Sequence, residues 1–542
     1  YRVENLKNKI KKNLQKSKTI FGQMPDWNPA EIIGKHPYPL ISSLYKKLVL
    51  DFAWIKARKI MGYCDNFSDK KLMEVYLGQS FVDVRKSFTS FIPNKVPLKL
   101  QKKLVDYYVE KLIKNPSMHD KIEFEISINC FIFDFEKRLK KLCSGILSKN
   151  EIYILKKRYK EIFKKNLFKY NKGSIFYNLK KINEMKTSYD VMKSENDLQK
   201  IINYTIKNGI IPFSILARHA FVAENVLQSL YRLKIIDQNK IFNFKTSLET
   251  VTSKFLYDCN LLSRNIISFK KFKDRYGHLR PGTYDINSKN YSQIKKNFFI
   301  NKKINEKNDF VLSNFKIKKI NSILKKNNLE INYTDLFAYL KNGIESREYS
   351  KFIFTKYVDL ILKKISKISK TNNLSKKEIS FLKIDEILKL NKNKISLKII
   401  RQIILKRKKD YKINKNIKLP ILMVDSKNVD VIPFQVSSPN FIGNKKVTGK
   451  LIYIDNRINF KKQELNKKIV LIENADPGYD WLFNFNIKGL VTKFGGANSH
   501  MSIRCNELKV IAAIGVGEKI FEEIKNKDEI ILDSGLKKIE AN

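Results

Sequence analysis

The chain has 542 residues, of which 43% are hydrophobic and 12% aromatic, so it can bury several cores and is expected to hold two to four domains. It contains no apolar run of about 18 residues, which argues against a membrane-spanning helix. The five cysteines are scattered without a Cys-x-x-Cys pair, which argues against disulfides and zinc and favours the cytoplasm.

The formal net charge of +54 allows two interpretations. A field of this size attracts nucleic acids and anionic membranes. The excess is mainly lysine spread along predicted helices, however, which is also what compositional drift on solvated faces produces. Residues 445–542 are nearly balanced in charge. We therefore regard nucleic-acid binding as the less favoured alternative, and the charge belongs to the remainder of the chain.

The first 418 residues predict a largely helical region, with a division into two subdomains near residues 120–150. The chain starts with tyrosine and has no signal peptide, so we expect a fragment or a processed piece. A proline-rich segment, residues 21–45, contains Asp26, Trp27 and Asn28; a tryptophan among prolines is usually a packing anchor, although a ligand contact is the alternative. Amphipathic helices are predicted over residues 44–61, 100–114 and 151–163.

Residues 81–85 alternate between apolar and charged side chains, which predicts a half-buried strand. Asp83 and Arg85 would then point to the same face. They form either an ion pair or part of a pocket for an acceptor molecule.

Residues 215–231 are apolar nearly all round, which predicts a buried central helix. Arg218 and His219 within it need partners if they are buried. A satisfied core pair is the default interpretation, and a pocket lining is the alternative.

Residues 271–286 form a loop in which polar groups are dense. His278, Arg280 and Asp285 stand around a Pro-Gly turn, so the loop either binds a polar acceptor or is a well-bonded connector. Farther on, the charged stretch 406–418 is a candidate connector. Residues 419–444 predict a linker with short strands, and a β-rich domain follows at 445–542.

Within this last domain the sequence predicts a strand, a glycine turn, a helix and a second strand. Residues 490–492 and 510–514 are β-prone, Gly495 and Gly496 break the first strand, and Asn498 or Ser499 can cap the helix. His500 lies in the first turn, where free backbone N–H groups favour a phosphate.

His500 and Arg504 form the candidate catalytic pair. A neutral imidazole can attack phosphorus, and Arg504, one turn later, can direct its guanidinium toward the group that His500 carries. Such a carrier role requires a helical turn and a ring that is not walled into the interior. Met501, Cys505 and Leu508 share the face expected to pack on the sheet.

The run TKFGGANSHMSIRCNELKVIAAIGVG resembles the phosphohistidine motif of phosphoenolpyruvate-utilising enzymes, a family that includes phosphoenolpyruvate synthase, pyruvate phosphate dikinase and the rifampin phosphotransferases. The resemblance implies an α/β swivelling phosphohistidine domain after the helical region. It implies that His500 is the phosphorylated residue with Arg504 beside it, and that Gly495, Gly496 and Ser499 hold the phosphate.

The resemblance further implies a dikinase in which an ATP-grasp domain uses ATP and Mg²⁺ to phosphorylate the histidine. The loop at 271–286 and residues 22–34 also resemble the middle region of synthase-like proteins. No nucleotide site or metal site is found in this chain, so we expect the ATP-grasp domain upstream or on another polypeptide. The acceptor is pyruvate or another small molecule, with Asp83, Arg85, His278, Arg280 and Asp285 as candidate contacts. A non-catalytic phospho-carrier and a lysine-rich polyanion-binding protein are the alternatives.

Overall fold

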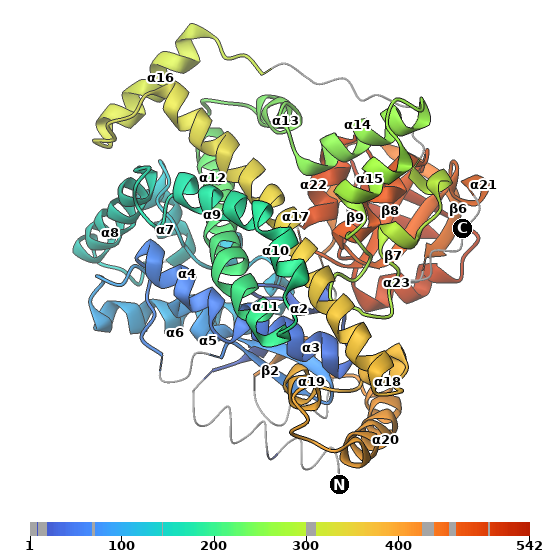
Figure 1. Ribbon diagram of the computed structural model, residues 1–542. Helices are drawn as coiled ribbons and strands as arrows, with labels where there is room; N and C mark the ends of the chain where they lie inside the picture. Colours follow the sequence, from blue (N-terminus) through green and yellow to red (C-terminus); the bar gives the residue numbers. More distant parts are fainter. Residues whose placement is uncertain are drawn as a thin grey trace.

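The computed structural model of the chain describes residues 8, 19–67, 71–143, 145–299, 310–424, 438–454, 462–496 and 499–541. A large helical region is followed by a C-terminal sheet with helices on both faces (Figure 1). The predicted order of a helical N-terminal and middle region before an α/β C-terminal part is confirmed.

The helices of the first region follow one another with few strands between them. In chain order, with η for 3-10 and π segments, they are α2 (Pro29–Ile33), α3 (Pro39–Tyr45), η1 (Lys46–Leu50), α4 (Ala53–Met61), α5 (Val84–Thr89), α6 (Leu98–Lys114), η2 (Pro116–Met118), η3 (Ile122–Ile126), α7 (Phe135–Cys143), α8 (Lys149–Leu167), α9 (Ile175–Thr187), α10 (Tyr189–Ser194), α11 (Leu198–Thr205), η4 (Ile206–Ile210), α12 (Ile211–Arg232), α13 (Gln238–Thr246), α14 (Val251–Ser263), α15 (Phe269–Tyr276), η5 (Tyr291–Gln293), η6 (Lys296–Phe299), α16 (Asn314–Lys326), α17 (Tyr333–Thr371), α18 (Lys376–Ile379), α19 (Ile384–Asn391) and α20 (Leu397–Asn414).

Two long helices, α12 and α17, pack against each other at the centre of this region (Figure 1). The predicted central helix is confirmed, since α12 is buried along most of its length. Together α11, η4 and α12 form one helical run, Leu198–Arg232, that is long and apolar enough to cross a membrane. Its apolar window is 72% buried inside the protein, as expected of a core helix.

A small antiparallel sheet joins the beginning and the end of the helical region. Its strands, in the order β2-β3-β1-β4, are β1 (Phe21–Gly22), β2 (Met73–Tyr76), β3 (Gln79–Asp83) and β4 (Leu422–Met423). The predicted strand over 81–85 is corrected here: it ends at Asp83, because the Asp83 carboxylate accepts a hydrogen bond from the Lys86 N–H and caps helix α5.

The charged stretch proposed as a connector is also corrected, because α20 continues through it to Asn414. Of the predicted linker at 419–444, residues 425–437 lie outside the described residues.

The C-terminal sheet has seven strands in the order β11-β10-β6-β7-β8-β9-β5. The inner strands β6 to β9 are parallel, and β5, β10 and β11 pair antiparallel at the edges. The elements are β5 (Asn440–Ile442), β6 (Lys446–Ile454), α21 (Lys462–Leu465), β7 (Ile469–Asn474), η8 (Pro477–Asn484), β8 (Gly489–Phe494), α22 (His500–Glu507), β9 (Ile511–Ile514), α23 (Gly517–Lys525), β10 (Glu529–Asp533) and β11 (Lys538–Ala541).

Alternation along the inner strands divides the core of the sheet into two faces. Ile469 and Leu471 pack with Phe521 of α23 on one face. On the other face, Val470 and Ile472 share a core with Met501 of α22. The predicted strand–helix–strand unit and the predicted packing of Met501 and Cys505 on the sheet are thus confirmed.

The core on the α22 side extends into the helical region. It includes Phe255 and Cys259 of α14, Phe272 of α15 and Phe299 of η6, together with Trp481 of η8. Figure 1 shows α14 and α15 lying against the C-terminal sheet. This contact brings the middle region directly against the helix that starts at His500.

Candidate functional site

The glycine turn after β8 places the start of α22 close to the strands on either side. Gly495 has a φ of +151°, and an added Cβ would lie 2.7 Å from the Ala475 Cβ and 2.8 Å from the Ile514 Cγ2. Only glycine fits such a backbone. The Ser499 hydroxyl accepts the Ser502 N–H at 3.2 Å and is the N-cap of α22; Asn498, the other predicted cap, lies outside the described residues.

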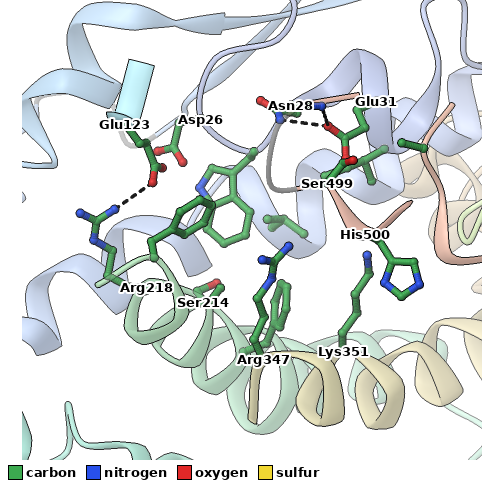
Figure 2. A pocket seen from close by; sticks show the side chains of 18 of the residues that line it. Asp26, Asn28, Glu31, Glu123, Ser214, Arg218, Arg347, Lys351, Ser499 and His500 are labelled. Carbon is green, nitrogen blue, oxygen red and sulfur yellow. Dashed lines mark hydrogen bonds and ion pairs between the residues drawn. The ribbon is translucent and has the colours of Figure 1, made fainter. Parts of the chain in front are cut away.

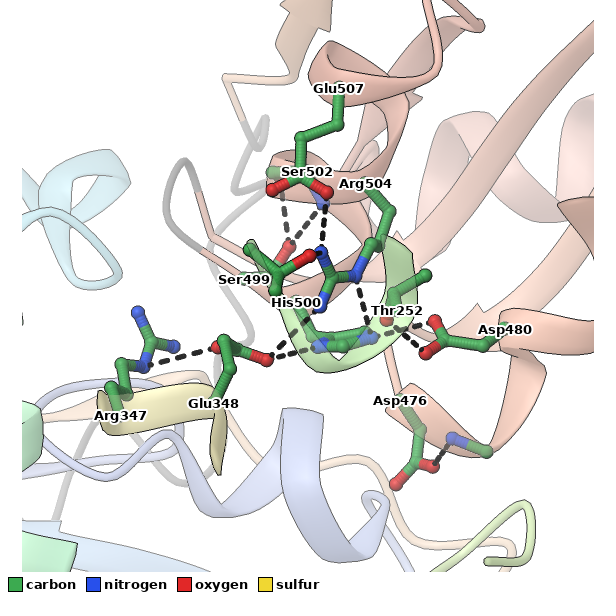
Figure 3. Close-up of polar contacts among 12 residues, drawn as sticks. Thr252, Arg347, Glu348, Asp476, Asp480, Ser499, His500, Ser502, Arg504 and Glu507 are labelled. Atoms are coloured by element: carbon green, nitrogen blue, oxygen red, sulfur yellow. Dashed lines mark hydrogen bonds and ion pairs between the residues drawn. The ribbon is translucent and has the colours of Figure 1, made fainter. Parts of the chain in front are cut away.

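His500 is the first residue of α22, and both of its ring nitrogens contact carboxylates (Figure 3). Nε2 lies 2.6 Å from Asp480 Oδ1, and Nδ1 lies 3.0 Å from Glu348 Oε2. Asp480 belongs to η8 in the same domain, whereas Glu348 comes from α17 in the helical region. The ring is only 6% exposed. This contact therefore holds the two parts of the chain together at the histidine.

The electrostatics of this cluster favour a charged imidazole. Burial alone would lower the pKa of His500, but Asp480 and Glu348 outweigh it and raise the pKa above its usual value. Both carboxylates have lowered pKa values, since the attraction of His500 and Arg504 outweighs their own burial. The two carboxylates thus favour the protonated form of the ring over the neutral form.

Arg504, one turn later on α22, completes the cluster (Figure 3). It pairs with Glu507, lies 3.4 Å from Glu348 and donates to the Thr250 hydroxyl at 3.0 Å. Its Nε is 3.4 Å from the Nε2 of His500, as the helical spacing predicted. The Arg504 guanidinium, which stays protonated at all accessible pH values, therefore lies beside the His500 ring.

A cavity of about 160 Å³ lies between the helical region and the C-terminal domain, with His500 and Ser499 in its wall (Figure 2). The turn at the start of α22 is regular, and His500 is among the residues that line the cavity. In this arrangement, however, its ring is enclosed, because it is buried and both ring nitrogens contact carboxylates. The lining combines five lysine and arginine side chains, several carboxyls and many aromatic rings: Asp26, Trp27, Asn28, Glu31, Ile32, Tyr45, Val49, Arg58, Asp120, Lys121, Ile122, Glu123, Phe124, Phe213, Ser214, Ala217, Arg218, Phe221, Thr283, Tyr284, Arg347, Lys351, Phe354, Thr355, Ala475, Asp476, Gly496, Ser499 and His500.

One face of α17 supplies cations next to the histidine. Arg347 and Lys351 are one turn apart and both line the cavity (Figure 2). The Lys351 ammonium makes no hydrogen bond or ion pair within the described part of the chain, and burial lowers its pKa. It is a positive charge available to an anion in the cavity.

Two buried carboxyls share this end of the cavity. Glu31 accepts hydrogen bonds from the Gly496 N–H at 3.3 Å and the Asn28 amide at 3.1 Å, while Asp476 accepts the Gly478 N–H at 2.7 Å. Burial raises the pKa of each of them. Both are therefore better proton acceptors than an exposed carboxylate would be.

None of the five residues predicted to contact the acceptor is in the described lining of the cavity. Asp83 caps α5 and accepts the Thr19 hydroxyl at 2.6 Å, and Arg85 pairs with Asp106 at 2.6 Å. These contacts of Asp83 and Arg85 are with other residues of the scaffold, and neither residue is in the described lining of the cavity.

The other three predicted contacts belong to the loop at 277–286. The predicted loop over 271–286 is corrected here, because α15 continues to Tyr276. His278 contacts the Phe352 carbonyl at 3.0 Å, and burial lowers its pKa to about 4. Arg280 pairs with Asp359, and Asp285 accepts the Asn287 N–H at 2.9 Å. The loop still reaches the cavity through its neighbouring residues Thr283 and Tyr284.

Sequence reasoning missed Glu348 and Asp480, and missed Arg347 and Lys351. The spacing of Arg347 and Lys351 on a helix was a usable signal, because residues four apart share a face. Asp26 and Trp27, by contrast, were noted from the sequence and do line the cavity, as does Arg218.

No group of three or more His, Cys, Asp or Glu side chains in the described residues is arranged to hold a metal ion. The five cysteines are all buried and free.

The comparison with protein families agrees with this geometry. Residues 465–535, which run from the end of α21 through β10, match the family described as PEP-utilising enzyme, mobile domain. No curated protein matches the chain. The C-terminal part of this chain is thus similar to the mobile domain of PEP-utilising enzymes. The predicted membership of the PEP-utilising enzyme family is confirmed for this domain.

Proposed function

We propose that the protein is a phosphotransferase in which His500 accepts a phosphoryl group and passes it to a hydroxyl of a small molecule bound in the cavity. The observation that carries the proposal is the position of His500. It is the first residue of α22, within the stretch that matches the family, and it lines a cavity formed largely by residues of the helical region.

The residues around the cavity fit the chemistry of such a transfer. The N–P bond to the His500 imidazole breaks and an O–P bond to the acceptor forms, while the hydroxyl proton passes to a buried carboxyl, Glu31 or Asp476. Arg504 and Lys351 offset the charge of the moving group. The released imidazole regains a proton and returns to its place between Asp480 and Glu348.

ATP and Mg²⁺ remain part of the proposal, on an ATP-grasp domain outside this chain, upstream or in trans. The described residues offer no metal cluster for them. Because the His500 ring is buried against Glu348, it must leave this contact to reach a donor. The C-terminal domain must therefore separate from α17 during the reaction cycle. The expected compartment, from the cysteine usage, is the cytoplasm.

The test is phosphorylation of the purified chain, either with ATP, Mg²⁺ and an ATP-grasp partner or with phosphoramidate as a chemical donor. We expect acid-labile phosphate on the wild type and none on His500→Ala. His36→Asn is the matched control, since this partly buried histidine is remote in sequence and should leave the labelling unchanged. Labelling that survives in His500→Ala would refute the proposal.

A further inference from the structure

The cavity has two chemically different ends. His500 and Lys351 lie at one end, and Asp26, Glu123 and Arg218 lie at the other (Figure 2). The proposed phosphoryl transfer uses only the first end. The far end lies within the helical region and has no role in holding the histidine.

The far end is a buried cluster of two guanidinium groups and two carboxyls. Arg58 Nη2 lies 3.2 Å from Asp26 Oδ2, and Arg218 Nη1 lies 3.1 Å from Glu123 Oε2. Each of the four side chains is at most 9% exposed. Arg58 and Arg218 also both stand 5.2 Å from the centroid of the Phe91 ring, so both guanidinium groups pack on the same aromatic side chain.

Two hydrogen-bond donors in the lining of this cavity that are fully screened from solvent have no acceptor among the described residues. These are the Arg218 Nε and the Trp27 Nε1. Buried donors are nearly always satisfied in folded proteins, because an unmade hydrogen bond costs the full desolvation of the group. A ligand that brings oxygen acceptors would satisfy both.

The charge of the cluster also favours an anion. Burial raises the pKa of Glu123 to about 7, with Arg218 opposing this and the neighbouring Asp26 reinforcing it. Two permanently charged guanidinium groups therefore face fewer than two full negative charges near neutral pH. The ligand group best matched to paired arginines is a carboxylate.

Between the two ends the cavity is aromatic. Trp27 packs on Phe213 with ring centroids 6.2 Å apart, Phe213 packs on Phe354 at 4.8 Å, and Phe124 packs on Phe221 at 5.8 Å. All five rings line the cavity. Such walls suit a flat apolar body.

We propose that the acceptor is a hydroxylated aromatic carboxylate, with its hydroxyl toward His500, its ring between the aromatic side chains and its carboxylate at Arg58 and Arg218. This inference rests on the proposed function for the fate of the hydroxyl, but the binding of the carboxylate is independent of it.

Binding is tested by calorimetry on the full chain with three probes: 4-hydroxycinnamate, its methyl ester and cinnamate. We expect the two acids to bind and the ester to bind at least about tenfold more weakly, the size of one lost charge-assisted contact. Arg218→Gln should weaken the acids by a similar factor and leave the ester unchanged. Trp27→Phe, which keeps a ring and loses only the N–H, gives a second reading if Arg218→Gln does not fold.

Equal binding of acid and ester, or no binding of any probe, would overturn the inference. So would loss of acid binding in Lys351→Gln with Arg218→Gln unaffected, because the carboxylate would then lie at the histidine end.

Transfer is scored separately on phosphorylated protein. Transfer of the labelled phosphoryl group from His500 to 4-hydroxycinnamate, without transfer to cinnamate, supports both proposals. Carboxylate-dependent binding with unlabelled His500 supports the site at the far end and contradicts the phosphotransfer, whereas labelled His500 with no aromatic acid bound contradicts only the acceptor.

Discussion

At the scale of residues, the central observation is an imidazole ring held by carboxylates from two parts of the chain. Asp480 is 20 residues from His500 in sequence and Glu348 is 152 residues away. The sequence motif predicted His500 and Arg504, because their relation is set by one helical turn. It could not predict Glu348, because that contact depends on how α17 packs against the C-terminal domain.

Glu348→Gln tests this contact. It keeps the shape of the side chain and removes the charge that faces both His500 and Arg504, so the pKa of His500 should fall toward its usual value. The free energy of unfolding should fall by up to about 3–5 kcal/mol, the usual cost of removing one charge of a buried pair. An NMR titration of the His500 ring measures the first effect and urea unfolding the second.

Glu330→Gln is the control for this change, since the Glu330 side chain is 87% exposed. An unchanged His500 pKa in Glu348→Gln would mean that Glu348 does not set the charge of the ring.

At the scale of elements, the polar residues of the loop at 277–286 bond within the scaffold, as the connector interpretation expected. The loop supports η8, the segment that carries Asp480. The backbone of Gly478 approaches this loop so closely that an added Cβ would lie 2.1 Å from the Arg280 carbonyl oxygen. Polar density in a sequence cannot distinguish a ligand site from a well-bonded support, because both need many hydrogen-bonding groups.

Gly478→Ala should therefore destabilise the protein by about 1–3 kcal/mol, as overpacking typically does, and should displace Asp480 from His500. The measurements are urea unfolding and the yield of phosphorylated His500, which should both fall. Gly449→Ala is the matched control, because its nearest neighbours are movable side-chain atoms of Lys488 and Ile469 at 3.2 and 3.3 Å. Equal effects of the two changes would remove the special role of Gly478.

The helices and strands of the C-terminal domain were easier to predict from the sequence than the small sheet of the helical region. The unit from β8 to β9 follows directly from its apolar runs, glycines and cap. The predicted end of strand β3 was two residues too late, because the alternation continued into the first two residues of a capped helix. The pairing of β4 with β1, some four hundred residues apart, left no signal in the sequence.

At the scale of the whole molecule, the charge state of His500 links the docking of the two parts to pH. The pKa of His500 in the folded protein is raised above its ordinary value of 6.5. Its contribution to stability is therefore fully present below pH 6.5 and is lost as the pH rises through the raised value. We expect the melting temperature of the wild type to fall over that interval relative to His500→Gln.

The comparison with His500→Gln isolates this effect from the other histidines. Burial lowers the pKa of His36, His219 and His278 to about 4, so these residues destabilise the fold as the pH falls toward that value. That trend is common to both proteins and cancels in the difference. Parallel melting curves from pH 6 to 9 would contradict the assignment of a charged His500.

The core shared by the sheet and α14, α15 and η6 has a practical consequence for anyone who wishes to isolate the histidine carrier. A gene fragment cut at residue 445 would leave Val470, Ile472 and Trp481 without the phenylalanines that cover them. We expect such a fragment to bind hydrophobic dyes and to self-associate. Co-expression with residues 249–299 should restore a monomer, and if it does, the smallest body able to travel with His500 is assembled from two separate stretches of the chain.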